Sequence, residues 1–225
     1  MSNNILVVAP HADDEILGLG GTISKFLKKK FKVTILILSN ANLGAPELFS
    51  KKKIKQIREE AIASHKSLGI INTIFAEFPA PQLKTFPSYK LSSYLEKVFL
   101  KINPEYLYIP FPNDLHDDHE KVYKCCLVAS RPSKKLNINN ILVYEVLSET
   151  NYAPTTGSNF NPNYYEDITS TLKNKIKAMK FYKSQLLKYP HCRSLEMIEY
   201  LARYRGSFIN KKYAESFMIE RIYNP

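Results

Sequence analysis

Several features that assign a chain to a specialised class of protein are missing from this sequence. It has no run of about 18 apolar residues, the length that a transmembrane helix requires. Its first residues carry no basic side chain, and the apolar run behind them is too short for a secretory signal peptide. We therefore expect a cytoplasmic protein without a transmembrane segment.

The sequence also lacks a disulfide or zinc-ribbon pattern. Its three cysteines include an adjacent pair, Cys125 and Cys126, and no Cys-x-x-Cys spacing occurs. An odd number of cysteines with two neighbours is a poor framework for disulfides and agrees with a reducing compartment. We expect all three to be packing residues.

No nucleic-acid-binding module is present, although the formal net charge is +11. The lysines form small groups along the chain instead of one basic arm, and no zinc finger or ribonucleoprotein motif accompanies them. We therefore expect no nucleic-acid partner. The charge is typical of a lysine-rich surface, and the alternatives are an anionic substrate or contact with a membrane surface. No motif specifies an oligomeric state, so a homo-oligomer is an open alternative.

Strand and helix patterns alternate along the first two thirds of the chain. The predicted strands are 5–9, 32–39, 70–78, 106–110 and 140–147, and the predicted helices are 15–30, 51–68, 88–102 and one that ends near 129. Such alternation is typical of an α/β fold with a mostly parallel sheet and helices on both faces. We expect a single domain over 1–225, with its core at about 5–147 and a C-terminal helical extension at 148–225.

The C-terminal extension departs from this alternation. Helices are expected over 169–187 and 194–205, and the apolar tail 214–222 fits either a short helix or an edge strand. Residues 149–165 are polar, aromatic and proline-rich, which predicts a long loop, and long loops in compact domains often serve function. Four of its aromatic side chains either contact a substrate or pack on the sheet: Tyr152, Phe160, Tyr164 and Tyr165.

Polar clusters follow two of the predicted parallel strands. Residues 10–15 read Pro-His-Ala-Asp-Asp-Glu directly after the strand 5–9, and residues 116–119 read His-Asp-Asp-His after the strand 106–110. Parallel strands end at one edge of a sheet, where open α/β sheets bind ligands, so we expect the clusters to form one site. A hydrolytic zinc site needs three nitrogen or oxygen ligands, a proton acceptor and an oxyanion-stabilising group. The two clusters hold enough side chains for all of these roles.

Three glycines follow the first cluster, at Gly18, Gly20 and Gly21, and they resemble a dinucleotide-binding loop only loosely. Carboxylates occupy the place where a pyrophosphate would lie, which favours a cation over a phosphate. We expect these glycines to serve close packing or the close approach of a ligand.

The first cluster resembles the His-Pro-Asp-Asp-Glu signature of the PIG-L/LmbE-like N-acetylglucosaminyl deacetylases, with Ala12 in place of proline. The pair at 116 and 119 resembles the second signature of that family. The resemblance implies a Rossmann-like fold that uses no dinucleotide. It also implies a zinc-dependent hydrolase, with Fe²⁺ as the alternative metal, that removes the acetyl group from an N-acetylated amino sugar. That sugar would be of the N-acetylglucosamine type, either free or nucleotide-, lipid- or phosphate-linked.

The same resemblance implies the roles of individual side chains. His11, Asp14 and His119 would hold the metal. Asp13 would be the general base, and protonated His116 would stabilise the oxyanion. A tyrosine that assists the oxyanion in some relatives is missing before the second cluster, so such a helper would come from elsewhere, for example from 149–165.

Arg58 matches an arginine that contacts sugar hydroxyls or a substrate phosphate in relatives. Glu15 either orients a ligand histidine or is a favourable acid in the first turn of a helix. Glu149 follows the last predicted strand and is a further candidate to reach the site. His65 and His191 are expected to be structural or exposed.

Carboxylates of the second cluster have supporting roles in this interpretation. Asp117 and Asp118 are expected to cap the helix or orient a ligand, and Asp114 is a further candidate for orienting one. Two other functions compete with the deacetylase. One is a metal-dependent hydrolase of another bond, such as a phosphoester or an amidine, although one compact ligand set favours a single metal. The other is a non-catalytic Rossmann-like protein that binds a sugar or nucleotide, which the presence of Asp13 disfavours.

Overall fold

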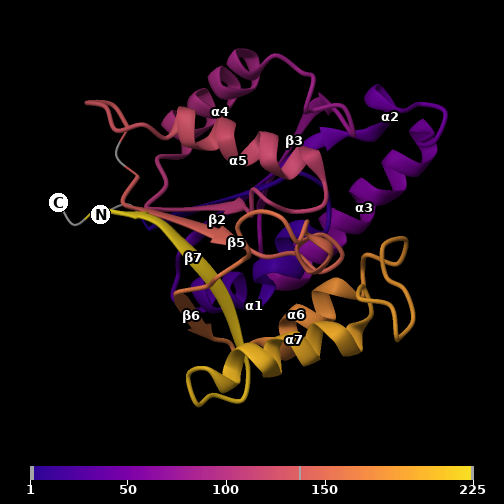
Figure 1. Ribbon diagram of the computed structural model, residues 1–225, viewed down its shortest axis with the longest axis vertical. Helices are drawn as coiled ribbons and strands as arrows, with labels where there is room; N and C mark the ends of the chain where they lie inside the picture. Colours follow the sequence, from indigo (N-terminus) through magenta and orange to yellow (C-terminus); the bar gives the residue numbers. More distant parts are fainter. Residues whose placement is uncertain (1–2, 137, 224–225) are drawn as a thin grey trace.

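A computed structural model describes residues 3–136 and 138–223 of the chain (Figure 1). Its strands are β1 (Asn4–Ala9), β2 (Lys32–Asn40), β3 (Asn72–Pro79), β4 (Tyr106–Pro110), β5 (Asn140–Tyr144), β6 (Tyr164–Asp167) and β7 (Ala214–Ile222). Its helices are α1 (Asp14–Lys28), α2 (Ala41–Gly44), α3 (Lys51–Leu68), α4 (Ser88–Ile102), α5 (Asp117–Ala129), the 3-10 turn η1 (Thr150–Tyr152), α6 (Leu172–Met179) and α7 (Leu195–Ser207). Up to residue 144 the predicted elements are present, with ends that shift by a few residues at most.

The strands form one sheet in the order β3-β2-β1-β4-β5-β7-β6. β1 to β5 run parallel, and β7 is antiparallel to both of its neighbours. The order reverses between β1 and β4, which pair directly, and ligands bind in open α/β sheets at this kind of switch point. The carboxyl ends of β1 and β4, each followed by one of the two polar clusters, therefore lie side by side.

Helices cover both faces of the sheet, as the alternation predicts (Figure 1). In β1, Val7 packs into a core with α1, α6 and α7, whereas Val8 faces a second core with α4 and α5. All three cysteines are buried free thiols, which confirms their interpretation as packing residues. Among the described residues, none of the helices combines the length and the apolar character that crossing a bilayer requires.

The C-terminal part differs from the prediction in three places. The helix predicted over 169–187 is limited to α6, the predicted loop 149–165 contains the start of β6, and the tail is β7, an inner strand rather than a helix or an edge strand. After α6 the backbone leaves the helix, and the Ser184 N–H donates to the Glu60 carboxylate 3.2 Å away. In this segment, hydrogen bonds to distant residues therefore override the helical preference of the local sequence.

Helix α1 contains a break that the C-terminal part repairs. Leu19 has non-helical angles (φ −144°, ψ 27°), which frees backbone groups on both sides of it. The Glu215 carboxylate of β7 accepts the N–H of Gly21 at 2.9 Å, and Lys175 Nζ of α6 donates to the Leu17 carbonyl at 2.7 Å. Lys175 Nζ also lies 2.7 Å from Glu215 Oε1, and both side chains are buried. This ion pair therefore supplies hydrogen-bond partners to backbone groups inside a kinked helix.

The glycines of α1 serve close packing, one of the two expected roles. A Cβ at Gly18 would lie 2.5 Å from Cδ2 of Tyr144, and a Cβ at Gly21 would lie 2.9 Å from Ile168. The Tyr144 hydroxyl in turn donates to the carbonyl of Val8 in β1 at 2.8 Å. Glycine therefore lets α1 approach the sheet and the segment after β6 closely.

Replacement of Lys175 by Met should destabilise the fold strongly, because it leaves the buried Glu215 carboxylate without its cation. We expect the free energy of unfolding, measured by urea titration, to fall by about 3–5 kcal/mol. Lys124→Met is the matched control, since Lys124 pairs with Glu120 on the exposed side of α5, and its effect should stay within about 0.5 kcal/mol. Equal effects of the two substitutions would contradict the role given to the buried pair.

Candidate active site

The first polar cluster forms a tight turn between β1 and α1. Asp13 has φ 119°, a left-handed conformation that costs a residue with a side chain on the order of 1–3 kcal/mol. Two hydrogen bonds hold this turn: the His11 N–H donates to Asp14 Oδ2 at 2.8 Å, and the Asp13 N–H donates to Glu15 Oε2 at 3.1 Å. Asp13 and Asp14 are both buried although both carry an ionisable carboxyl group.

Glu15 connects this turn with distant parts of the chain. Its Oε1 lies 3.0 Å from His65 Nε2 of α3 and accepts a hydrogen bond from the Tyr182 hydroxyl. His65 Nδ1 is 2.8 Å from Thr73 Oγ1 in β3, so the structural interpretation of His65 is confirmed. Glu15 contacts no candidate ligand histidine; it lies in the first turn of α1 and holds the backbone of Asp13.

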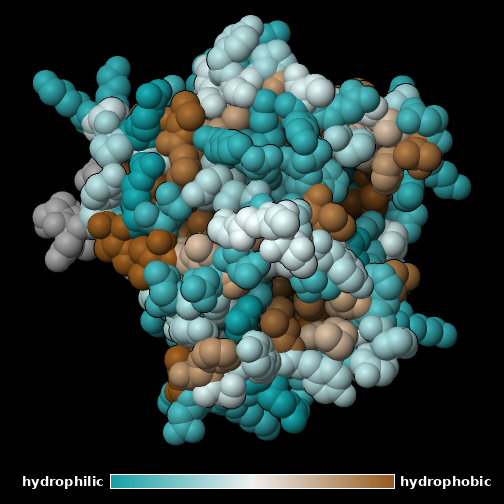
Figure 2. Space-filling view, viewed as in Figure 1, coloured by the Kyte–Doolittle hydropathy of each residue, from teal (hydrophilic) through white to brown (hydrophobic). Residues whose placement is uncertain are grey.

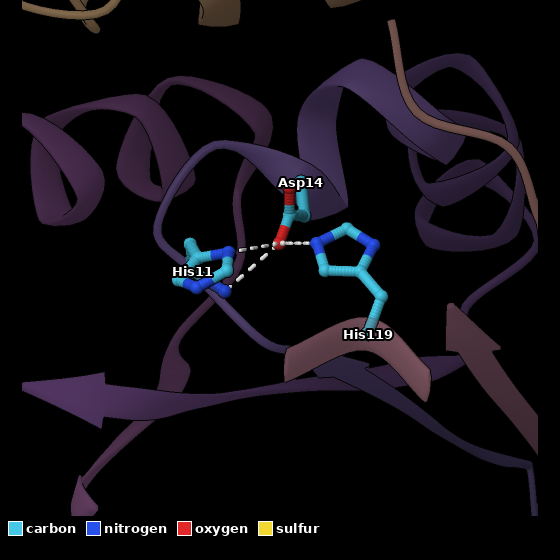
Figure 3. A group of neighbouring side chains, drawn as sticks. All are labelled: His11, Asp14 and His119. Atoms are coloured by element: carbon cyan, nitrogen blue, oxygen red, sulfur yellow. Dashed lines mark hydrogen bonds and ion pairs between the residues drawn. The ribbon is translucent and has the colours of Figure 1, made fainter. Parts of the chain in front are cut away.

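The second polar cluster forms the start of α5. His119 lies in the first turn of that helix and is fully buried, and its Nδ1 is 2.7 Å from Asp114 Oδ2. Its Nε2 lies 3.4 Å from Asp14 Oδ2, and His11 Nδ1 lies 3.4 Å from the same oxygen. Figure 3 shows the two imidazoles on opposite sides of the Asp14 carboxylate. The fold therefore brings His11, Asp14 and His119 together.

The donor atoms of these three side chains suit a divalent cation. They lie within 4.8 Å of one another, and the two N···O separations of 3.4 Å from Asp14 Oδ2 match the separation of about 3.3 Å between ligands of tetrahedral zinc. His119 Nε2 is buried and has no hydrogen-bond partner among the described residues. An unpartnered buried nitrogen that faces a carboxylate is what a metal ligand requires.

Each of the two histidines is oriented by its own carboxylate. Asp114 contacts Nδ1 of His119, and Asp118 Oδ2 lies 3.2 Å from Nε2 of His11. Such pairs fix the ring orientation of metal-binding histidines. The orienting roles expected of Asp114 and Asp118 are thus observed, whereas Asp117 is exposed and pairs with Lys84. A second group, His11 with His116 and Asp118, has suitable spacing too: Asp118 Oδ2 lies 3.2 Å from His11 Nε2 and 3.9 Å from His116 Nδ1.

The charges of His11, Asp14 and His119 stabilise one another. Burial disfavours a charge on Asp14, but His119 and His11 outweigh that effect and hold the pKa of Asp14 well below its usual value. Burial also lowers the pKa of His11, but hydrogen bonds to Asp118 and Asp14 outweigh it and raise that pKa to about 9. The pKa of His119 rises to about 10 because the two aspartates around it outweigh its burial. The carboxylates therefore stabilise positive charge between His11 and His119, and a divalent cation supplies such a charge.

Asp13 lies beside this set in a different environment. Burial raises the pKa of Asp13 to about 8, although the Arg193 guanidinium opposes the increase. Arg193 Nη1 lies 3.6 Å from Asp13 Oδ2, which has no hydrogen-bond partner among the described residues. A buried carboxyl with a pKa near neutrality is suited to accept and return a proton.

Arg193 is the site residue that no sequence pattern indicated. It belongs to the irregular segment between α6 and α7, and Ser148 and Glu149 hold its guanidinium at 2.6 Å and 3.3 Å. Glu149, a candidate from its position after the predicted strand, does reach the site. Nothing in the local sequence around Arg193 resembles a motif, so only the folded chain reveals its proximity to Asp13.

His116 precedes α5 and lies next to His11, with ring centroids 4.5 Å apart. Burial and the positive charge on His11 lower the pKa of His116 to about 4, so this environment favours a neutral ring. Its Nδ1 accepts the N–H of Asp118 at 3.2 Å. The proton of the neutral ring is therefore on Nε2, which is available as a donor.

Part of this site lines a cavity of about 390 Å³, within the size range of small-molecule sites. His11, Asp13, His116, Glu149 and Arg193 are among its lining residues. Arg58 lies at its border, where its Nη2 is 2.7 Å from Glu77 Oε1.

The aromatic residues of 149–165 do not line this cavity. Phe160 packs against Phe111 with ring centroids 5.4 Å apart, Tyr164 lies near Phe217, and Tyr165 stacks on Phe208. Tyr152 is exposed. Packing is thus the observed role for Phe160, Tyr164 and Tyr165. His191 is exposed and is not one of the described residues that line the cavity.

Replacement of His119 by Gln should weaken zinc binding severely, because it removes the buried nitrogen that faces Asp14. Asp114→Asn should weaken zinc binding by roughly 10- to 100-fold, since the outer partner orients the ring without touching the metal. His191→Gln, an exposed histidine, is the control and should bind zinc like the unmodified protein. Competition with a chromophoric chelator measures all three affinities. Unchanged zinc affinity in His119→Gln would contradict the proposed ligand set.

Comparisons with known proteins identify the family of this chain. The chain is 25% identical over 223 residues to diacetylchitobiose deacetylase of Thermococcus kodakarensis, covering 94% of this chain and 80% of that protein. It is 23% identical over 192 residues to a probable N-acetyl-alpha-D-glucosaminyl L-malate deacetylase 2 of Bacillus cereus, covering 82% and 84%. The crystal structure of a conserved protein from Thermus thermophilus has the same fold, with a TM-score of 0.79, 22% identity and coverage of 98% and 96%. Residues 6–130 match the PIG-L family, described as GlcNAc-PI de-N-acetylase, and the chain belongs to this family.

Proposed function

We propose that the protein is a metal-dependent N-deacetylase that removes the acetyl group from an N-acetylated amino sugar of the N-acetylglucosamine type. The observation that carries the proposal is the pair of imidazoles around Asp14, one of which, that of His11, lines a cavity together with the buried Asp13. The substrate class is supported by the names of two relatives, diacetylchitobiose deacetylase and probable N-acetyl-alpha-D-glucosaminyl L-malate deacetylase 2.

The chain's own residues suit one divalent cation held by His11, Asp14 and His119. Mixed imidazole and carboxylate donors about 3.4 Å apart favour Zn²⁺, with Fe²⁺ as the alternative. When bound, such an ion polarises the amide carbonyl and lowers the pKa of water.

Asp13 accepts the proton of the attacking water and then returns it to the nitrogen of the leaving amine. Its raised pKa suits both steps, because a base with a pKa near the working pH is also a competent acid. His116 donates a hydrogen bond from Nε2 to the oxyanion of the tetrahedral intermediate. Arg193 keeps a positive charge beside Asp13, and Arg58 at the cavity border contacts the sugar or a group attached to it.

We further propose that residues 1–225 act as one domain in the cytoplasm. The C-terminal part supplies Arg193 and Glu149 to the cavity and Lys175 to the interior of α1, so the core at 5–147 does not contain the whole site. The three buried free cysteines agree with a reducing compartment.

Replacement of Asp13 by Asn should abolish turnover while the metal stays bound, since the amide cannot accept a proton. We expect the rate of acetate release from N,N′-diacetylchitobiose by the zinc-loaded protein to fall by roughly 10²- to 10⁴-fold. Asp117→Asn, in the exposed first turn of α5, is the control and should keep its activity. An Asp13→Asn protein that turns over at the normal rate would rule out this mechanism.

Replacement of Arg193 by Ala should lower kcat by roughly tenfold or more, because it removes a preorganised charge beside the reacting groups. Arg193→Lys should recover part of the loss, since it restores the charge without the planar contacts to Ser148 and Glu149. Arg203→Ala, an exposed arginine of α7, serves as the control. Equal kcat values for the Ala and Lys variants would show that the charge at this position does not contribute to the rate.

A further inference from the structure

The irregular segment between α6 and α7, residues 180–194, forms one wall of the candidate site. Its residues in the cavity lining are Ser184, Gln185 and Arg193. Most of its side chains are exposed or half-buried. Figure 1 shows the segment as the orange loop beyond the end of α6, and Figure 2 shows mostly hydrophilic residues over the same place. Because the segment buries little apolar surface, polar contacts are what fix its position.

Glu60 of α3 anchors this segment. Its carboxylate accepts the Ser184 N–H at 3.2 Å and the Ser184 hydroxyl at 2.6 Å. It also accepts a hydrogen bond from Gln56, one turn earlier in the same helix, at 3.1 Å. The neighbouring Glu59 instead lies 3.8 Å from Lys55. Of two adjacent carboxylates in α3, Glu60 is therefore the one that contacts the wall of the site.

A chain of hydrogen bonds leads from this anchor towards the general base. Arginine only donates, so the Gln185 amide oxygen faces Arg193, with Oε1 3.4 Å from Nη1. The Gln185 amide nitrogen then donates to Ser184 Oγ at 3.0 Å, and the Ser184 hydroxyl donates to Glu60. All donors point in the same direction, and the chain ends on a carboxylate, which only accepts. The acceptor at position 60 therefore sets the direction of the whole chain.

The backbone of the segment adds a second connection. The Leu187 N–H donates to the Arg193 carbonyl at 3.1 Å, which closes residues 187–193 into a loop. This loop begins a few residues after Ser184, at the anchored end of the segment. The Arg193 guanidinium lies 3.6 Å from Asp13 Oδ2. A shift of Ser184 therefore moves Arg193 relative to Asp13.

We propose that Glu60 is a positioning residue for the deacetylation: it anchors residues 184–193 and so holds the Arg193 guanidinium beside Asp13. Glu60 is not one of the described residues that line the cavity, so it acts through the hydrogen-bond chain and not on the substrate. The inference rests on the proposed deacetylase function and extends the residues that support its chemistry to α3.

Replacement of Glu60 by Ala should lower kcat for N,N′-diacetylchitobiose, measured on the zinc-loaded protein, by roughly threefold to tenfold, the effect of losing one hydrogen bond. KM should change much less, because Glu60 does not line the cavity. Glu60→Gln should recover most of the loss, since its amide oxygen still accepts the Ser184 hydroxyl. Glu59→Ala is the matched control and should keep the kcat of the unmodified protein. An unchanged kcat in Glu60→Ala would overturn the proposal.

A double substitution tests whether Glu60 acts through Arg193. If it does, adding Glu60→Ala to the Arg193→Ala protein should lower kcat no further, because the positioned group is already absent. A loss by the same factor in both backgrounds would show that Glu60 affects the rate by another route, and the positioning role would be wrong.

Limited proteolysis tests the anchor independently of activity. Lys183 and Lys188 are exposed and lie on either side of Ser184 in the chain. Trypsin cleavage after these lysines, followed by mass spectrometry of the fragments, should be roughly threefold to tenfold faster in Glu60→Ala, because cleavage follows the population of the open segment. Glu59→Ala should be cleaved like the unmodified protein. Equal cleavage of Glu60→Ala and the unmodified protein would contradict the anchor.

The two measurements separate failure of this inference from failure of the deacetylase function. If no N-acetylated amino sugar is deacetylated but Glu60→Ala is cleaved faster, the anchor stands and the deacetylase proposal fails. If the unmodified protein is an active deacetylase but Glu60→Ala keeps both its kcat and its resistance to trypsin, the opposite holds.

Discussion

The geometry of the candidate site depends on the buried carboxylate of Glu15. This group holds the N–H of Asp13 and also contacts His65 of α3 and Tyr182 of the segment after α6. Asp13 can keep its left-handed conformation because these contacts are made together, and a strained backbone persists only where its surroundings determine it fully. The turn that carries three of the site's side chains is therefore supported from the core.

Around that turn, charge balance organises the site. The Asp14 carboxylate lies between two imidazoles, and each imidazole has its own aspartate behind it, Asp118 for His11 and Asp114 for His119. The arrangement attracts a cation at the switch point of the sheet. On the α3 side the charges have the opposite sign, because Lys53 and Arg58 line the same cavity.

The C-terminal part contributes to both stability and chemistry, although the family match ends at residue 130. Lys175 and Glu215 satisfy backbone groups at the break in α1, the helix that follows the turn with Asp13. Arg193 and Glu149 complete the wall of the cavity. Because α1 begins within the turn that carries Asp14, the extension supports the site as well as the sheet.

Local patterns in the amino-acid sequence were enough to predict the alternation of strands and helices up to residue 144, the place of the two polar clusters at one sheet edge, and the need for glycine in α1. These features follow from hydrophobic periodicity and from the position of polar residues after buried strands. The folded chain was needed to establish that α6 ends at Met179, that β7 is an inner strand, and that Arg193 lies beside Asp13. Those features depend on partners far away in the chain, such as Glu60 for Ser184 and β5 and β6 for β7. Local patterns carry no record of such partners, because a hydrogen bond or ion pair between distant segments exists only after the chain has folded.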